Sequence, residues 1–365
     1  MRIALDGMGG DLGPGEMVAG AVQAVCELGL HVTLLGDETI LHKALENHER
    51  ELSVCQPAPS DNDASPAVEV KSAFSRIDIV HTTQVVEMGE APLEAVRHKK
   101  DSSIMVAFRL LKKGRVDAVV SAGNSGATMA AAVKTVGRLP GISRPGIAGI
   151  FPTMKKPLVM MDVGANVDCR PIHLLQFGAM AAAFSKLLFG IERPRVGLLS
   201  IGEERGKGNA LVKGAHELLS KSRLNYIGNV EGRDTFQGEV DVMVCDGFVG
   251  NVCLKLSEGL AEAMVAMLRE EFDKSLTSKV GYLLSRSSYA SLKKRTDYAE
   301  YGGAPLLGLN GIGIICHGRS HSKAIKNAVR IAAELVENRV NDHIVDLLTN
   351  ALPAMDVAVA DVSAP

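Results

Sequence analysis

Short runs of consecutive apolar residues recur along the chain, and each ends in a glycine-rich polar turn that leads into a helical pattern. The clearest run lies at residues 116–120 and is followed by a polar turn at 121–128 and an alanine-rich stretch. The same order of strand, turn and helix returns at residues 158–168, 195–209, 240–251 and 311–320. Uninterrupted apolar strands that alternate with helices are typical of a parallel sheet covered on both faces. We therefore predict a three-layer α/β/α fold with a mostly parallel sheet.

One long segment departs from this alternation. Residues 255–295 have the pattern of two helices with a break near residues 277–278, and the first helix carries an apolar stripe at Leu256, Leu260, Met264, Met267 and Leu268. We predict a projecting helical hairpin, at about 255–300, inserted into a single domain that covers residues 1–350. A second copy of the chain could cover the stripe. Residues 351–365 show no clear period, and we expect a disordered tail.

The second helix of this hairpin mixes apolar and aromatic residues with basic ones. Tyr282, Leu283 and Leu284 lie in the same stretch as Lys279 and Arg286. Such a mixture can rest on a membrane surface. A buried seam between the two helices with a basic rim is the alternative interpretation.

Composition and charge narrow the class of protein. The chain has 365 residues, of which 46% are hydrophobic, and 40 basic residues nearly balance 42 acidic ones. A formal charge of -2 gives no bulk field that would recruit nucleic acid, so we expect no nucleic-acid partner. The chain opens directly on a strand pattern, and no signal peptide is visible. We predict a cytoplasmic protein, because six cysteines without a Cys-x-x-Cys pair favour reduced thiols in a cytosol.

The polar turns supply the candidate chemistry. In a parallel sheet the loops at the carboxyl ends of the strands share one edge, so we expect these turns to converge. Backbone N–H groups at helix starts suit an anion. Lys207 stands between two glycines and can direct its ammonium into the shared edge; the alternative is a solvated loop lysine. Asn251 is either a functional donor or the N-cap of its helix, and Asp246 either orients Lys207 or caps that helix. Asn124 and Asn166 carry the same ambiguity as Asn251.

Several chemistries are disfavoured by the motifs. The chain has no Ser-His-Asp order, no His-Glu-x-x-His and no Walker sequence, and the glycines at 7–13 lack dinucleotide-binding spacing. None of the six cysteines forms a Cys-x-x-Cys pair, which favours reduced, buried thiols over zinc or disulfides. Cys245 and Cys316 are the weaker candidates for a catalytic thiol. We predict no metal and no organic cofactor.

The motifs taken together resemble one family. They are 6–11 (DGMGGD), 99–103 (KKDSS), 121–127 (SAGNSGA), 162–168 (DVGANVD), 207–209 (KGN), 228–231 (GNVE), 246–252 (DGFVGNV) and 301–306 (YGGAPL). In this order they closely resemble the PlsX family of phosphate acyltransferases, over residues 1 to about 340. Two positions depart from the family pattern: Gly89 precedes Glu90 where an acidic pair is usual, and Ser200 stands where Asn is usual.

The resemblance implies a reaction and its setting. A long-chain acyl group on acyl carrier protein reacts with inorganic phosphate to give acyl phosphate for phospholipid synthesis. It also implies an isopropylmalate-dehydrogenase-like fold, a homodimer and peripheral association with the inner face of the cell membrane. A membrane glycerol-3-phosphate acyltransferase would act next.

The resemblance also implies a site. By position, Lys207 and Asn251 are the catalytic candidates, and the turns line the substrate cleft with Asn124, Ser125, Asn166, Asp168, Asn209, Asn229 and Asp246. Tyr282, Leu283 and Leu284 are the candidate membrane tip. Two alternatives stay open: a phosphotransacetylase-like enzyme that uses a short acyl-CoA, and a non-catalytic membrane-docked scaffold of lipid-synthesis enzymes.

Overall fold

The sheet is the frame of the molecule. A computed structural model describes residues 1–54, 74–296 and 300–351, and within these residues eleven strands form one sheet in the order β3-β2-β1-β4-β11-β10-β5-β6-β9-β7-β8. The predicted α/β fold is confirmed, because most neighbouring strands pair in parallel. From β1 to β11 the strands are Arg2–Asp6, His31–Gly36, Ile77–His81, Ala118–Ser121, Gly146–Phe151, Leu158–Met161, Val196–Leu199, Tyr226–Val230, Val242–Val244, Ala304–Leu307 and Ile312–Ile315.

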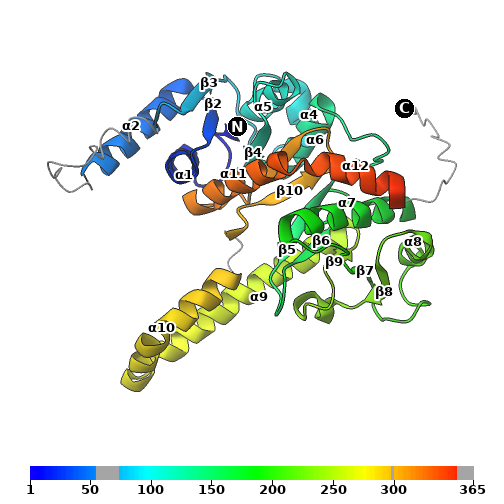
Figure 1. Ribbon diagram of the computed structural model, residues 1–365. Coiled ribbons are helices and arrows are strands. Elements are labelled where there is room, and N and C mark those ends of the chain that lie inside the picture. The colour runs from blue at the N-terminus through cyan, green and yellow to red at the C-terminus, as the bar shows by residue number, and fades with distance from the viewer. Residues whose placement is uncertain (55–73, 297–299, 352–365) are drawn as a thin grey trace.

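Helices cover both faces of this sheet, because its strands are apolar on both sides (Figure 1). Ile3 and Leu5 face one layer of helices, whereas Ala4 between them faces the other. The first layer contains α1 (Pro14–Leu28), α2 (Glu38–Val54), α7 (Pro171–Phe189), α8 (Ala210–Lys221), α11 (Ser322–Glu337) and α12 (Val340–Ala351). The second contains α4 (Pro92–His98), α5 (Ser103–Lys112) and α6 (Ser125–Thr135).

Helix α7 is the one helix of the described residues that is long and apolar enough to cross a membrane. It packs instead against the sheet, and 72% of its apolar window is buried. The helix is therefore a core element of the first layer.

The sheet is not parallel throughout. Strand β10 runs antiparallel to both β11 and β5, and β5 runs antiparallel to β6. The block β3-β2-β1-β4-β11 therefore points one way, and the block β6-β9-β7-β8 points the other way. Because strands in a sheet twist by about 20–25° per step, the four steps from β4 to β6 turn the two blocks by roughly 90°.

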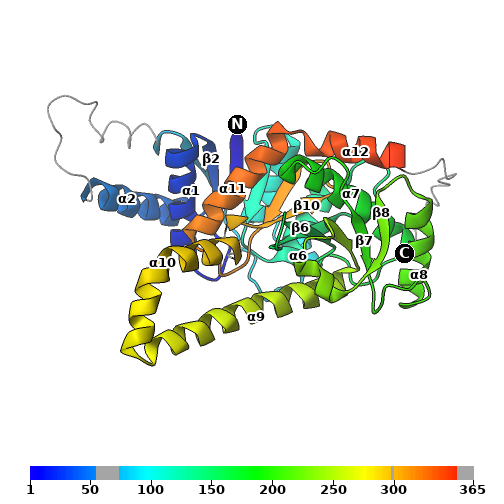
Figure 2. The same cartoon turned by 60° about the horizontal axis from the view of Figure 1, so that its bottom comes forward.

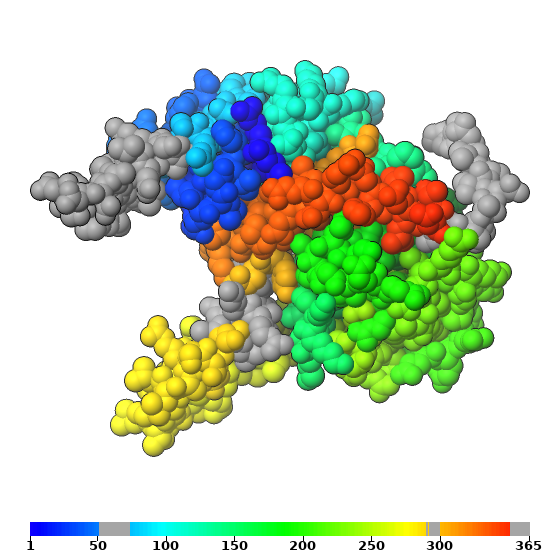
Figure 3. Space-filling view, viewed as in Figure 1, coloured from blue at the N-terminus to red at the C-terminus, as the bar shows by residue number. Residues whose placement is uncertain are grey.

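Two long helices leave the body of the molecule as a hairpin (Figures 1 and 2). They are α9 (Gly247–Asp273) and α10 (Leu276–Thr296), so the break falls at Lys274 and Ser275 rather than at the expected 277–278. The space-filling view shows the hairpin standing clear of the α/β body (Figure 3). The expected disordered tail lies outside the described residues apart from Ala351, which ends α12.

Candidate active site

The turn after β6 is built around one buried carboxylate. Asp162 follows the strand directly, is fully buried, and accepts hydrogen bonds from the backbone N–H groups of Ile147 (3.0 Å), Ala165 (3.1 Å) and Asn166 (2.6 Å). Burial raises the pKa of Asp162 above its ordinary value, whereas these hydrogen bonds favour the charged form. The carboxylate fixes the path of residues 163–166, and Gly164 takes a positive φ of 139° within it.

The first turn of α9 packs directly on the β6 turn. Gly247 donates its N–H to the carbonyl of Asn166 at 2.7 Å, and a Cβ on Gly250 would lie 1.9 Å from the carbonyl oxygen of Asp162. Only glycine permits this approach. The contact places Asn251 beside Gly164, whose own Cβ would lie 3.6 Å from Oδ1 of Asn251.

The structure shows which of Asp246 and Asn251 is the N-cap of α9. Asp246 is the N-cap of α9, because its Oδ1 accepts from the N–H groups of Phe248 and Val249, both at 3.0 Å. Asn251 lies one turn later with an exposed side chain. It is therefore not the cap, and its amide faces the β6 turn.

The loop with Lys207 leaves the same edge of the sheet. Strand β7 lies beside β9, with Leu198 opposite Val244, so the loops after both strands emerge next to each other. Lys207 is exposed, and its stem lies close to Gly202, where a Cβ would be 3.0 Å from Lys207 Cγ. Within the described part of the chain no carboxylate forms an ion pair with its ammonium. Asn209 closes the loop as the N-cap of α8, accepting from Val212 N–H at 2.9 Å.

Two buried polar atoms beneath this loop have no partner in the protein. Asn229 on β8 donates its Nδ2–H to the carbonyl of Glu204 at 3.0 Å, but its Oδ1 is unpaired among the described residues. The hydroxyl of Ser200, which opens the loop, is also buried and unpaired there. Buried polar atoms are usually satisfied, so these two are the polar groups of the loop that remain available to a bound water.

The other block of strands carries a similar arrangement around Asp6. This buried carboxylate accepts from the Ser121 hydroxyl at 2.8 Å, and burial raises its pKa. Asn124 caps α6 by accepting from Ala127 N–H at 2.9 Å, and its Nδ2 reaches the carbonyls of Met88 and Glu90, both at 3.0 Å. The side chain of Asn124 therefore ties the preceding loop to the helix start.

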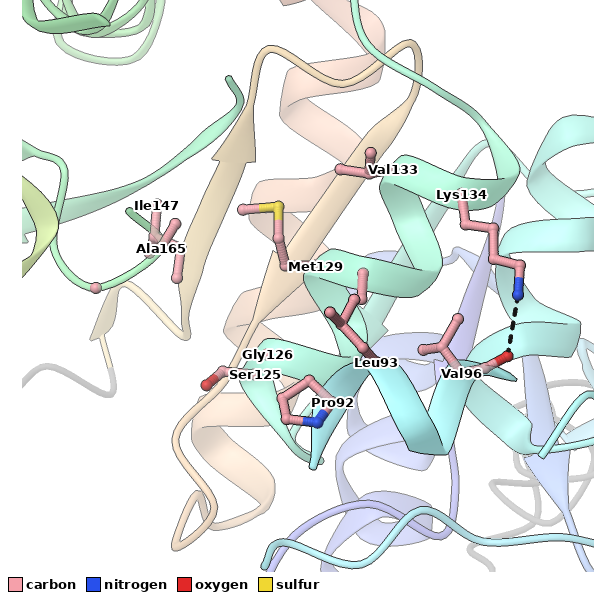
Figure 4. A pocket seen from close by; sticks show the side chains of 12 residues that line it. Pro92, Leu93, Val96, Ser125, Gly126, Met129, Val133, Lys134, Ile147 and Ala165 are labelled. Carbon is pink, nitrogen blue, oxygen red and sulfur yellow. Dashed lines mark hydrogen bonds between the residues drawn. The ribbon is translucent and has the colours of Figure 1, made fainter. Parts of the chain in front are cut away.

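An apolar groove of about 500 Å³ joins the two blocks (Figure 4). Its lining includes Ser125 and Gly126 from the start of α6, and Gly164 and Ala165 from the β6 turn. The remaining lining is almost entirely apolar and comes from α4, α6 and β5: Pro92, Leu93, Val96, Met129, Ala130, Val133, Lys134 and Ile147. Lys134 contributes its aliphatic stem, because its ammonium donates to the carbonyl of Val96 at 3.3 Å.

The expectation that all polar turns share one edge is wrong. The turns with Asn166, Asp168, Lys207 and Asn251 follow β6, β7 and β9, whereas the turn with Asn124 and Ser125 follows β4 in the opposing block. The reversal through β10 and β5 separates them. The groove is what brings the β4 and β6 turns to a common place.

The remaining candidate residues differ in what they contact. The Nδ2–H group of Asn166 donates to the carbonyl of Pro145 at 2.8 Å and to Asp162 at 2.9 Å. Asp168 is exposed, and its carbonyl accepts from Arg144 at 2.7 Å. Lys99, in the basic cluster of motif 99–103, pairs with Glu90. Asn166 and Lys99 thus hold the fold around the site.

Sequence reasoning did not single out Asp162 or the groove. The signal for Asp162 is a carboxylate placed directly after an apolar strand and before Gly164, a position that requires internal donors if it is buried. No sequence motif marks the groove, because its lining consists of ordinary apolar residues from separate elements.

Cys245 and Cys316, the candidate catalytic thiols, are both buried. Burial raises the pKa of Cys316 to about 12 and also raises the pKa of Cys245, so few thiolates exist at neutral pH. No group of three or more metal-ligating side chains occurs in the residues that the structure describes.

Known proteins resemble this chain in both structure and sequence. The EutD phosphotransacetylase from Staphylococcus aureus aligns with a TM-score of 0.55 at 18% identity, covering 92% of this chain and 94% of that one. A phosphotransacetylase from Streptococcus pyogenes aligns with a TM-score of 0.56 at 17% identity, covering 94% of each chain. At such identities these likenesses establish the fold alone, that of an α/β protein with a mostly parallel sheet.

Sequence relatives are much closer. A family model described as "Fatty acid synthesis protein" matches residues 1–343. The phosphate acyltransferase of Geotalea daltonii is 50% identical over 353 residues, covering 97% of this chain and 96% of that protein. The phosphate acyltransferase of Nitratidesulfovibrio vulgaris strain DP4 is 51% identical over 347 residues, covering 95% and 94%. The protein is an acyltransferase. It belongs to the phosphate acyltransferase (PlsX) family, as the motifs predicted.

Proposed function

We propose that this protein moves a long-chain acyl group from acyl carrier protein to inorganic phosphate and releases acyl phosphate for phospholipid synthesis. The single observation that carries the proposal is the position of the apolar groove. Ser125 and Gly164 both line it, and Asn251 lies beside Gly164. A carbonyl held there would meet polar groups while its hydrocarbon chain lies in the groove.

The reaction needs positioning more than a strong acid or base. A phosphate oxygen attacks the thioester carbonyl carbon, a C–O bond forms, the C–S bond breaks, and the thiolate takes a proton from solvent. Phosphate is already anionic near pH 7, and a thiol with a pKa near ~8.5 is a fair leaving group. The enzyme must hold phosphate close to the thioester carbonyl and stabilise the oxyanion that forms on the carbonyl oxygen.

The exposed polar side chains fit these two tasks. We assign the role of phosphate ligand to Lys207, because its ammonium has no ion-pair partner in the described chain and its loop begins at the unsatisfied Ser200 and contacts Asn229 through the Glu204 carbonyl. Asn251 supports the role of donor to the oxyanion, since its amide lies beside Gly164 of the groove lining and is not used as a helix cap. The other assigned residues, Asn124, Asn166 and Asp246, support the backbone that presents these groups.

The donor is the part of the proposal that most needs a direct test. Purified protein with phosphate would be given palmitoyl-carrier protein and acetyl-CoA in separate reactions, and acyl phosphate would be trapped as a hydroxamate. We expect turnover with the carrier-bound long chain. A preference for acetyl-CoA would replace the proposal with a phosphotransacetylase-like activity, and no acyl phosphate from either donor would favour a scaffold.

We also propose a homodimer formed through α9. Its stripe is exposed at Leu256, Leu260, Met264 and Met267, each more than half exposed, along a helix that stands clear of the body (Figure 3). A second copy could bury the same stripe by twofold symmetry. Leu256→Glu with Leu260→Glu should give a monomer in sedimentation, whereas Glu262→Gln on the same helix should leave the dimer intact.

Peripheral membrane association is the last element of the proposal. Leu283 and Leu284 on α10 are 67% and 82% exposed, which supports contact with lipid. Tyr282 is different, because its ring packs on Phe272 of α9 with centroids 5.2 Å apart. We therefore propose a cytoplasmic enzyme at the inner membrane face, where a glycerol-3-phosphate acyltransferase would take its product.

A further inference from the structure

The groove between the α4–α6 pair on one side and Ile147 and the β6 turn on the other runs along α6. Along α6 it runs from the polar Ser125 to Val133 and the stem of Lys134, and Ile147 and Ala165 lie on the wall across from Met129 (Figure 4). On α6 the lining positions are 125, 126, 129, 130, 133 and 134, one face of the helix over more than two turns. Ser125 and Val133 are therefore about 12 Å apart along the helix axis.

We infer that this groove is the acyl-chain site, with the methyl end toward Val133, and that Ala130 and Val133 limit the length of chain accepted. This inference rests on the function proposed above. The carbonyl must lie at the polar end, where phosphate can reach it, so the chain can extend only along α6. The volume of about 500 Å³ lies in the range of pockets that bury small molecules, about 300–1,000 Å³.

The walls fit a hydrocarbon chain and little else. Met129, Ala130 and Val133 are partly buried, and Leu93 on α4 is 75% exposed although it lines the groove. A large apolar side chain left open to solvent beside an apolar groove would be covered by a bound chain. The only charged side chain in the lining is Lys134, and its ammonium is already held by the Val96 carbonyl.

The start of the groove is closed by close packing of two helices. A Cβ on Gly126 would lie 2.5 Å from Cγ of Pro92, so glycine lets the beginning of α4 contact the beginning of α6. A chain cannot leave between the two helix starts. The ends of the groove therefore differ in chemistry, with a polar entrance at Ser125 and an apolar far end at Val133.

The test compares two blocking variants of the full-length enzyme. Ala130→Phe and Val133→Phe would be assayed with octanoyl-, lauroyl- and palmitoyl-carrier protein, and kcat/KM for acyl phosphate formation would be compared with wild type. Each buried methylene contributes about fourfold in affinity. We expect Val133→Phe to lose about tenfold or more on palmitoyl and less than about twofold on octanoyl, because only the far end is filled.

Ala130→Phe should act on shorter chains. Position 130 lies about 4.5 Å nearer to the polar end, so lauroyl should lose activity as well as palmitoyl. Val345→Phe is the matched control, since Val345 is a half-buried valine of α12 on the opposite face of the sheet. Its chain-length profile should equal that of wild type. Leu93→Asn removes an exposed side chain, which avoids a folding defect, and should lower palmitoyl turnover several-fold.

The outcomes separate this inference from the proposed function. Equal losses at every chain length, or unchanged palmitoyl turnover in both phenylalanine variants, would overturn the chain site while the activity itself stands. If wild type makes no acyl phosphate, the function fails, and binding of a fluorescent long-chain fatty acid then decides the site. Binding to wild type that Val133→Phe weakens would support the groove, and equal binding to both would reject it.

Discussion

Asn251 on the first turns of α9 lies against Gly164 in the turn after β6, where a Cβ on the glycine would be 3.6 Å from the asparagine Oδ1. The relationship depends on a chain of contacts. Asp162 fixes the β6 turn, and Gly250 lets α9 approach the Asp162 carbonyl. Asn251 is thereby held beside Gly164, which lines the apolar groove.

Gly164→Ala tests this contact. The φ of 139° is unfavourable for alanine, and the new methyl group would face Asn251. We expect kcat/KM for acyl phosphate formation to fall by about tenfold, corresponding to 1–2 kcal/mol of strain. Gly259→Ala, in α9 with no atom near its Cβ position, is the control and should keep full activity. Wild-type activity in Gly164→Ala would contradict the arrangement.

Asp162 is predicted to be a stability residue. Asp162→Ala leaves the N–H groups of Ile147, Ala165 and Asn166 without their acceptor, so the free energy of unfolding should fall by about 3 kcal/mol or more. Asp162→Asn keeps one acceptor oxygen and should lose less. Denaturant titration measures both. The exposed Asp168→Ala should change stability by less than about 0.5 kcal/mol, and a similar loss there would remove the special role of Asp162.

Local elements of this fold could be predicted from the sequence, whereas the reversal of the sheet could not. Strand, turn and helix are local patterns, so each predicted apolar run contains a strand, and the hairpin predicted at about 255–300 matches α9 (Gly247–Asp273) and α10 (Leu276–Thr296). The reversal of the sheet is not local. It depends on pairing of Leu306 with Ile147, which are far apart in the chain, and for this reason the polar turns were wrongly expected at one edge.

The same limit applies to the roles of single side chains. Asp246 and Asn251 are both good capping residues, and only the start of α9 at Gly247 shows that Asp246 is the cap. Likewise, the sequence shows Asn124 only as a polar residue in a turn, whereas in the structure its amide donates to the carbonyls of Met88 and Glu90. Capping depends on where a helix begins, and these long-range contacts depend on tertiary packing.

A pH dependence of stability follows from His173. This histidine is buried, its Nδ1 accepts from the N–H of Arg170 at 3.1 Å, and burial together with Arg144 and Arg170 lowers its pKa to about 4. Between about pH 6.5 and 4 the unfolded chain binds a proton that the folded chain does not. Stability should therefore fall as pH is lowered through this window. His173→Gln should flatten this part of the profile, and an equally steep fall in the variant would contradict the assignment.

Leu283 and Leu284 lie within α10, about two turns from the hairpin turn at Lys274 and Ser275 rather than at its tip, and they give a prediction that is independent of catalysis. Leu283→Asp with Leu284→Asp replaces two exposed apolar side chains with charges and should abolish binding to anionic liposomes in a flotation assay. Soluble turnover should stay within about twofold of wild type, because neither residue lines the groove and the hairpin projects from the body (Figure 1). Leu276→Asp, near the turn between the helices, tests whether another exposed leucine of the hairpin also contributes to liposome binding. Unchanged liposome binding in the double variant would rule out this contact.

The most direct test of the central claim is one assay that follows both products of the reaction. Wild type, Lys207→Ala and Asn251→Ala would receive palmitoyl-carrier protein and oxygen-labelled phosphate, with free thiol and labelled acyl phosphate measured together. The account predicts equal amounts of both products from wild type, a loss of about 100- to 1,000-fold in each variant, and a raised KM for phosphate in Lys207→Ala. Lys213→Ala, on α8 beyond the loop, should behave as wild type. Free thiol without labelled acyl phosphate, or near-normal turnover in both site variants, would contradict the account.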